Sequence, residues 1–269
     1  NCSIKDIELI AFSQSPGLGP ILKIGAQVAR MLSQLLSVPL IGVNHCIAHI
    51  EIGRFQCKID DPLTLYVSGG NTIVSAFESS HYQIFGETLD IPIGNMIDSF
   101  ARDAGIPHPG GPKIELLARK STRYLDLPYI VKGMDLSFSG LYTAAKRLLQ
   151  SDEFNRNYFL EDVAYSLQET SFSMLAEVTE RALAHTEKRE VLLTGGVAAN
   201  KRLQEMIRNI CNDHNSRFEV VPLKYAGDNG AMIAWTGILR HLSEGPHEIS
   251  QTKIRPKQRM DKISIPWRD

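Results

Sequence analysis

Two histidines at helical spacing are the residues of this chain whose types and positions point most directly to chemistry. His45 and His49 are four positions apart, and no Pro or Gly interrupts the chain between Asn44 and Gly53. On a helix, side chains four positions apart point from one face, and two neutral imidazoles on one face can hold one divalent metal ion. A lone histidine pair also arises incidentally, so the metal hypothesis needs a further ligand from elsewhere in the chain.

The pair follows a predicted strand. Residues 38–43 form a short apolar run typical of a buried strand, and Asn44 has the side chain of a helix N-cap. Open α/β sheets place ligands at the carboxyl ends of their strands. The zinc-protease motif His-Glu-x-x-His is absent, because Cys46 stands at the position of the catalytic Glu and Glu51 points to a different face. A metalloprotease is therefore disfavoured.

Composition limits the class of protein. The chain has 269 residues, 43% of them hydrophobic, and a formal net charge of −1, so local patches or another subunit must meet any RNA partner. No apolar run approaches the roughly 18 residues of a membrane span. The cysteines form no Cys-x-x-Cys pair, which favours a reducing, cytoplasmic compartment over a disulfide framework; they are Cys2, Cys46, Cys57 and Cys211.

The first region is expected to alternate strands and helices. A strand over residues 7–13, a loop over 14–20, a helix over 21–36 and a strand over 39–43 give a β-α-β-α order, which implies a parallel sheet. The Gly-x-Gly loop could cradle a phosphate or be only a turn. The chain begins without Met and resembles a fragment. Its basic segment, residues 253–262, and the residues after it are expected to return to this first region.

A second region begins near residue 62. Residues 63–68 and 73–77 predict a hairpin around Gly69 and Gly70, whose bare N–H groups could wrap an anion or merely form a turn. A third strand at 82–86, a helix at 94–102 and the longest helix at 159–185 follow. A buried strand at 191–194 leads into a double glycine and a helix, an arrangement that suits nucleotide binding. A strand at 218–221 and a helix at 231–242 complete the region.

Three further candidates have simpler explanations beside the functional ones. Asp228 precedes a helix, so it could cap that helix or serve as a metal ligand. Asp98 lies four positions before Arg102, the spacing of a common solvated ion pair. A basic cluster could be a solvated face or could touch RNA phosphate; it comprises Arg119, Lys120 and Arg123.

Several stretches together resemble one family. They are residues 15–20 (SPGLGP), 42–49 (GVNHCIAH), 66–72 (YVSGGNT), 86–90 (GETLD), 138–141 (FSGL), 195–200 (GGVAAN) and 227–233 (GDNGAMI). The chain resembles the TsaD/KEOPS catalytic-subunit family, the tRNA threonylcarbamoyladenosine transferases. Tyr66, Asp90-Ile91 and the ending Trp267-Arg268-Asp269 resemble the archaeal and eukaryotic KEOPS branch.

The resemblance implies an α/β fold of the actin-like ATPase (ASKHA) type, with two lobes and a site between them. Residues 1–61, joined by 244–269, would form the first lobe, and residues 62–243 the second. Family members begin with additional strands, so the first lobe is expected to be N-terminally incomplete.

The resemblance also implies the site residues. His45, His49 and Asp228 would ligate one divalent ion, iron or zinc, with Tyr66 as a further ligand. The turn after the first hairpin strand would meet the threonylcarbamoyl and phosphate end of the substrate, through Tyr66, Val67, Ser68, Gly69 and Gly70. The ribose and adenine of an adenine nucleotide or threonylcarbamoyl-AMP would be held in the interlobe cleft by Asp98, Gly111, Glu115 and Asn200.

The implied reaction is acyl transfer from threonylcarbamoyl-AMP to the adenosine 3′ of the tRNA anticodon. No Ser-His-Asp set is evident, so no catalytic residue is expected beyond the metal and substrate ligands. KEOPS membership implies partner subunits, among them a small atypical protein kinase and a dimerisation subunit. The alternatives are an actin-like ATPase or phosphotransferase, and a nucleotide-binding scaffold for a kinase.

Overall fold

The computed structural model describes residues 3–268, which form two compact units. The first unit contains the residues up to Lys58, the segment Phe77–Gln83 and the residues from Asp228 onward. The second contains Ile59–Ala76 and Ile84–Gly227. This division differs from the expected lobes at residues 59–61, 77–83 and 228–243. Residues 228–243 join the first unit because their helix packs on its two strands.

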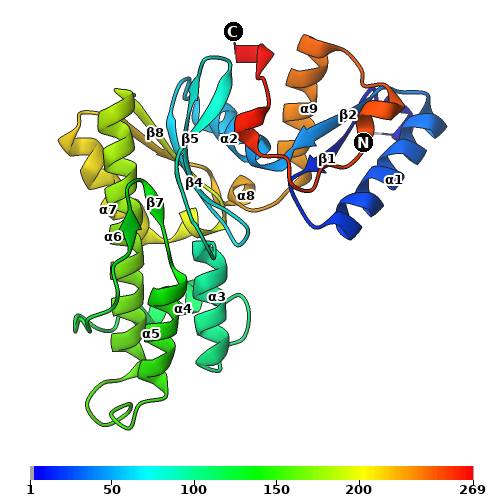
Figure 1. Cartoon of the computed structure of the whole chain (residues 1–269). Coiled ribbons are helices and arrows are strands. Elements are labelled where there is room, and N and C mark those ends of the chain that lie inside the picture. The colour runs from blue at the N-terminus through cyan, green and yellow to red at the C-terminus, as the bar shows by residue number, and fades with distance from the viewer. Residues whose placement is uncertain (1–2, 269) are drawn as a thin grey trace. The chain divides into compact units, whose positions relative to one another are not determined.

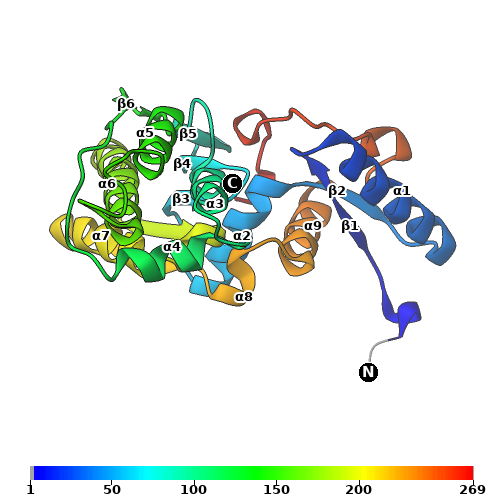
Figure 2. The same cartoon turned by 90° about the horizontal axis from the view of Figure 1, so that it is seen from below.

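The first unit is built on two parallel strands, β1 (Ile10–Ser15) and β2 (Leu40–Asn44). Phe12 packs with the buried face of helix α1 (Gly19–Leu36), whereas the next residue back, Ala11, lies against Gly237 of helix α9 (Gly230–Glu244). Figures 1 and 2 show α1 and α9 on opposite sides of the strand pair, as the alternation along a strand requires. The parallel β-α-β prediction is confirmed, although the first strand begins three residues later than expected.

Helix α1 carries an apolar stripe that faces away from the unit's core. Its buried residues are Leu22, Ala26 and Ala29. The larger apolar residues that predict the helix are mostly exposed; they are Ile21, Ile24, Val28, Met31 and Leu35. The periodicity therefore predicted the helix but not the face that it buries.

The first unit also contains helix α2 (His45–Cys57) and several short 3-10 helices. Helix α2 packs against α9, which also contacts the last short helix. The C-terminal segment belongs to this unit and contains three short 3-10 helices. The 3-10 helices of the unit are η1 (Ile4–Asp6), η3 (Ile249–Thr252), η4 (Met260–Lys262) and η5 (Pro266–Arg268).

The second unit contains a mixed five-stranded sheet in the order β5-β4-β3-β8-β9. Strand β3 pairs antiparallel with β4 and parallel with β8, and β8 pairs parallel with β9. The predicted hairpin and its third strand are confirmed. The strands are β3 (Leu63–Val67), β4 (Thr72–Glu78), β5 (His81–Glu87), β8 (Glu190–Thr194) and β9 (Arg217–Val220).

The long helix α6 (Leu160–Thr186) organises the helical part of this unit, and it contacts α4, α5, α7 and β3 (Figure 1). The predicted helix is confirmed, and its apolar residues Val163, Leu167, Phe172, Leu175 and Val178 are all buried. The other elements are α3 (Ile93–Asp103), α4 (Gly111–Ala118), β6 (Val131–Lys132), β7 (Asp135–Leu136), α5 (Ser139–Leu149), η2 (Gly196–Ala199), α7 (Lys201–Asp213) and α8 (Leu223–Ala226).

Two predictions from composition can be examined in the described residues. Cys46, Cys57 and Cys211 carry reduced thiol groups, while Cys2 lies outside the described part of the chain. Across residues 3–268, no helix has the length and apolar character that crossing a membrane requires.

Candidate functional site

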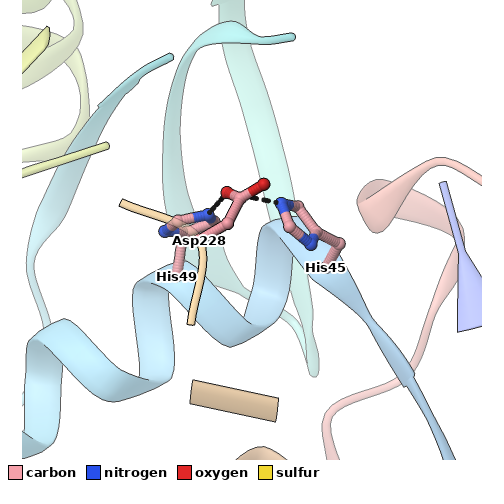
Figure 3. A group of neighbouring side chains, drawn as sticks. All are labelled: His45, His49 and Asp228. Carbon is pink, nitrogen blue, oxygen red and sulfur yellow. Dashed lines mark hydrogen bonds and ion pairs between the residues drawn. The ribbon is translucent and has the colours of Figure 1, made fainter. Parts of the chain in front are cut away.

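Helix α2 places the two histidines at the start of its first two turns. The Asn44 side chain accepts hydrogen bonds from the backbone N–H groups of Cys46 (3.0 Å) and Ile47 (3.2 Å), so it caps the helix as predicted. Both imidazoles point from the same side of α2, with ring centroids 4.9 Å apart (Figure 3). The His49 side chain is 1% exposed and that of His45 is 21% exposed.

Asp228 supplies the third converging group. One of its carboxylate oxygens lies 3.2 Å from His45 Nε2 and 3.1 Å from His49 Nε2, and all three ligand atoms lie within 4.8 Å of one another (Figure 3). The interpretation of Asp228 as a helix cap is wrong. Asn229 caps α9, since its side chain accepts the N–H of Met232, and Asp228 is left to face the histidines.

The electrostatics of the group suit a cation. Hydrogen bonds from His45 and His49 hold the pKa of Asp228 well below its usual range, so the carboxylate is anionic. Burial lowers the pKa of His49, and the hydrogen bond with Asp228 offsets part of that shift. A neutral imidazole and an ionised carboxylate are the protonation states that a metal ion requires of such ligands.

The donor set fits a divalent metal ion. Metal bonds to imidazole nitrogen and carboxylate oxygen are about 2.0–2.2 Å long, which sets two ligand atoms on one ion roughly 3.0–3.6 Å apart. The two N···O separations fall in this range. Three protein ligands leave coordination positions for substrate, as in catalytic sites, and the Asp228 side chain is 76% exposed. Burial raises the pKa of Cys46 to about 12, so this neighbour offers no thiolate.

The second unit contains a pocket of about 270 Å³, slightly smaller than the roughly 300–1,000 Å³ typical of small-molecule sites. Five of the expected substrate residues line it; they are Gly69, Asp98, Gly111, Glu115 and Asn200. The sequence did not single out its other lining residues, which are Gly94, Ile97, Pro109, Pro112, Gly196, Val197 and Ala199. Most of these lie in two glycine-containing segments, residues 107–112 and 195–200, of which the second is among the stretches that carry the family resemblance.

The two carboxylates of the pocket are held in place by the backbone. Asp98 accepts the N–H of Gly110 at 2.9 Å, and Glu115 accepts the N–H of Lys201 at 3.0 Å. The alternative in which Asp98 forms an ion pair with Arg102 is wrong, because the Arg102 guanidinium donates a hydrogen bond to the Ser99 hydroxyl instead. Carboxylates fixed in this way at a pocket wall can accept hydrogen bonds from hydroxyl groups of a ligand.

The side chains of Asn200 and Ser68 already form hydrogen bonds within the protein. The Asn200 side chain accepts the N–H groups of Arg202 and Leu203, capping α7, and donates to Gln168 at 3.0 Å. The Ser68 hydroxyl accepts the N–H of Gly70 at 3.2 Å and so closes the hairpin turn.

The remaining residues expected at the substrate lie in and beside β3. Tyr66 and Val67 are buried at the end of this strand, where Tyr66 is paired in register with Ile73 and Thr194. Gly70 lies in the turn that follows and does not line the pocket among the described residues.

A buried network on α2 was not predicted. Glu51 is 1% exposed, accepts a hydrogen bond from the Tyr82 hydroxyl at 2.5 Å and pairs with Arg54 at 2.7 Å. Arg268 donates to the Tyr82 oxygen at 3.3 Å and stacks over the ring of Phe77. The sequence places Glu51 on a face other than that of the histidines, but nothing in its spacing indicates partners 31 or more residues away.

Comparison with known proteins identifies relatives over most of the chain. A family model described as TsaD, tRNA N6-adenosine threonylcarbamoyltransferase, matches residues 1–235. A probable bifunctional tRNA threonylcarbamoyladenosine biosynthesis protein of Methanocaldococcus jannaschii is 58% identical over 262 residues, which are 97% of this chain and 48% of that protein. A tRNA N6-adenosine threonylcarbamoyltransferase of Archaeoglobus fulgidus is 54% identical over 97% of this chain and 79% of its own length. The chain thus spans about half the length of the bifunctional relatives.

Solved structures of low sequence identity share the fold. HypF of T. kodakarensis superposes with a TM-score of 0.67 at 17% identity, over 87% of this chain and 40% of that one. An activator of a 2-hydroxyisocaproyl-CoA dehydratase from Clostridium difficile, solved with bound ADPNP, gives a TM-score of 0.50 at 10% identity and covers 87% of this chain. The fold is α/β, of the actin-like ATPase type. With the family model covering residues 1–235 and relatives more than half identical, the chain belongs to the TsaD family.

Proposed function

We propose that this chain transfers the threonylcarbamoyl group from threonylcarbamoyl-AMP to the adenosine 3′ of the anticodon in tRNA. The observation that carries the proposal is the convergence of His45, His49 and Asp228 within a chain of the TsaD family. In the reaction, the exocyclic amine of the adenosine forms a bond to the carbamoyl carbon. The bond from that carbon to the phosphate oxygen breaks, AMP leaves, and the amine loses a proton to solvent or to a group of the donor.

His45, His49 and Asp228 are proposed to hold one divalent ion, iron or zinc. Such an ion, when bound, supplies Lewis-acid polarisation of the carbamoyl group and neutralises phosphate charge. The buried His49 and the capped helix fix two of the three ligand atoms before any ion arrives, which lowers the cost of assembling the site. Tyr66 is proposed as a further ligand on the family resemblance alone.

The pocket of the second unit is proposed to bind the adenosine half of the donor. Its volume suits a nucleoside, and Asp98 and Glu115 are positioned to accept hydrogen bonds from ribose hydroxyls. Gly111 and Gly196 leave the walls open for close approach of a ring. The Ser68–Gly70 turn is proposed to meet the threonylcarbamoyl and phosphate end.

The acceptor RNA, the cellular compartment and the partner subunits are proposed from the family resemblance. The target base must be unstacked, as an anticodon loop allows, and tRNA is the acceptor. We propose that the chain works in the cytoplasm within a KEOPS assembly of the archaeal and eukaryotic branch, with a small atypical protein kinase and a dimerisation subunit. The two units are proposed to correspond to the two actin-like lobes.

The direct test is a transfer assay on the full-length protein with its partner subunits. Threonylcarbamoyl-AMP labelled in the threonyl group is incubated with tRNA, and label in the RNA is counted. The variant is His45→Ala/His49→Ala, and the matched control is His185→Ala/His214→Ala, which removes two histidines outside the metal group. We expect label to enter tRNA with the wild type and the control, and to fall at least a hundredfold with the variant.

Other outcomes would favour other functions. Equal labelling by the variant would remove the metal group from the mechanism. ATP turnover without RNA labelling would indicate an actin-like ATPase or phosphotransferase. Intact partner binding with neither activity would indicate a scaffold that docks a kinase.

A further inference from the structure

A short C-terminal segment has a high density of positively charged residues. Residues 253–262 contain five cations and one anion, so this segment has a net charge of +4 and the rest of the chain −5. The cations are Lys253, Arg255, Lys257, Arg259 and Lys262, and all five are exposed. Such a concentration on an otherwise acidic protein creates a local positive field.

Three of these cations are available to a partner. Within residues 3–268, the side chains of Lys253, Arg255 and Lys257 form no ion pair, whereas Arg259 and Lys262 both contact Asp261. We call Lys253, Arg255 and Lys257 the basic strip. Their charges are thus not neutralised within the described chain.

The backbone beneath the basic strip is fixed to the first unit. The Gln14 side chain donates to the carbonyls of Gln251 (2.6 Å) and Lys253 (2.8 Å), and the Gln14 carbonyl accepts the N–H of Arg255 at 3.0 Å. The carbonyl of Pro256 accepts the N–H of Gly17 at 3.1 Å. A segment held at four points presents its cations at fixed positions and loses less entropy on binding than a free tail.

The same segment is joined to the start of the metal-ligand helix. Asn44, which caps α2, donates to the carbonyl of Gln258 (3.4 Å) and to the hydroxyl of Ser15 (3.2 Å). Ser15 in turn donates to the Gln258 side chain at 3.0 Å. The basic strip therefore ends one residue before a direct contact with the cap of the helix that carries His45.

We propose that the basic strip is a contact surface for the phosphates of the acceptor RNA. The fixed unpaired cations supply sequence-independent affinity, and their link to the α2 cap sets the bound backbone relative to the metal ligands. Between the cations, Ile254 packs inward on the Phe12 cluster and Pro256 is the exposed apolar residue, so the strip offers no large apolar side chain to insert into a membrane. The identity of the RNA rests on the proposed function; the location of the contact does not.

The experiment measures tRNA binding directly, without transfer, as a function of salt. The full-length protein carries Lys253→Gln/Arg255→Gln/Lys257→Gln, and the matched control carries Lys132→Gln/Arg147→Gln/Arg156→Gln, an equal loss of exposed charge in the second unit. We expect the strip variant to bind at least tenfold more weakly at physiological salt. The slope of log affinity against log salt should flatten by about 2–3 if three phosphate contacts are lost. Lys253→Arg/Lys257→Arg should bind like the wild type.

Each contrary outcome overturns the proposal. Unchanged affinity and slope in the strip variant would show that RNA binds elsewhere, and an equal loss in the control would show only a general charge effect. Weaker binding with an unchanged slope would indicate a structural disturbance. Strip-dependent binding to phosphatidylserine vesicles as tight as that to tRNA would assign the strip to a membrane. A separate outcome concerns the wild type: if it binds tRNA through the strip but transfers no label, the proposed function fails and the strip proposal stands.

Discussion

At the scale of single residues, Asp228 illustrates how the fold settles what a sequence leaves open. It precedes α9, and a capping role would have explained it fully. The structure gives that role to Asn229 and turns the Asp228 carboxylate toward His45 and His49, 183 and 179 positions back in the chain. Spacing alone cannot predict such a pairing; the family resemblance supplied it.

A substitution of Tyr82 tests how much the buried hydrogen-bond network around Glu51 contributes to stability. Tyr82→Phe removes the hydroxyl that donates to the buried carboxylate of Glu51, so we expect a loss of about 1–3 kcal/mol in the free energy of unfolding. Tyr124→Phe is the matched control; Tyr124 is 49% exposed, and its loss should stay within about 0.5 kcal/mol. Urea unfolding of both variants measures the difference. Equal losses would contradict a special role for the Glu51 network.

Asp90 gives a prediction about pH. Although burial opposes it, the pKa of Asp90 is held well below its usual range by hydrogen bonds from the hydroxyls of Ser137 and Ser139 and from two backbone N–H groups, those of Phe138 and Ser139. A lowered pKa in the folded state contributes stability above the unfolded pKa of about 3.9, and this contribution is lost as pH falls.

We therefore expect Asp90→Asn to lower the free energy of unfolding at pH 7 by about 1 kcal/mol or less, since Asp90 is exposed and the charge is screened. The gap to the wild type should begin to close as pH falls below about 4 and should continue to close toward the lower folded-state pKa. Denaturant unfolding at pH 7, pH 3.5 and pH 2.5 measures it. A gap that widens in acid would contradict the assignment.

At the scale of elements, the turn between β8 and η2 depends on two glycines with different tasks. Gly195 has φ of +97°, and a Cβ there would lie 2.1 Å from the Val67 carbonyl oxygen. A Cβ on Gly196 would have no heavy atom within 4 Å, yet Gly196 lines the pocket. The first glycine therefore serves the packing of β3 on β8, and the second the space for a ligand.

The pair makes a matched test. Gly195→Ala should cost about 2–4 kcal/mol of stability, because the methyl group meets backbone and φ is unfavourable. Gly196→Ala should change stability by less than about 0.5 kcal/mol and weaken adenine-nucleotide binding several-fold. Thermal unfolding and nucleotide titration separate the two effects. Gly196→Ala binding nucleotide as the wild type does would argue against the pocket as the nucleotide site.

Most helices and strands were predictable from the local sequence pattern. Which face of each element is buried, and against which neighbour, was not. The alternating β-α-β order, the hairpin around Gly69 and the long helix α6 follow from periodicity and turn residues. The exposed stripe of α1 shows the limit, since helical spacing does not say which face is buried. Small residues, Ala26 and Ala29, face the strands because α1 lies close to them.

At the scale of the whole molecule, each compact unit carries one of the two proposed sites. His45, His49 and Asp228 all belong to the first unit, and every residue that lines the pocket belongs to the second. The pocket residues come from four separate stretches of the chain, which only the sheet and α6 bring together. Glycines marked two of those stretches in the sequence, at residues 69–70 and 195–196, but the convergence of all four is a property of the fold.

The measurement that tests the central claim most directly is metal reconstitution of the full-length protein with its partners, followed by transfer to tRNA. Metal-free protein receives iron(II) or zinc in steps, and bound metal and RNA labelling are measured on the same samples. We predict that RNA labelling rises with bound metal and levels off at one ion per chain. The Asp228→Asn variant should neither retain the ion nor label RNA. Full labelling by chelator-treated, metal-free protein, or by Asp228→Asn without bound metal, would contradict it.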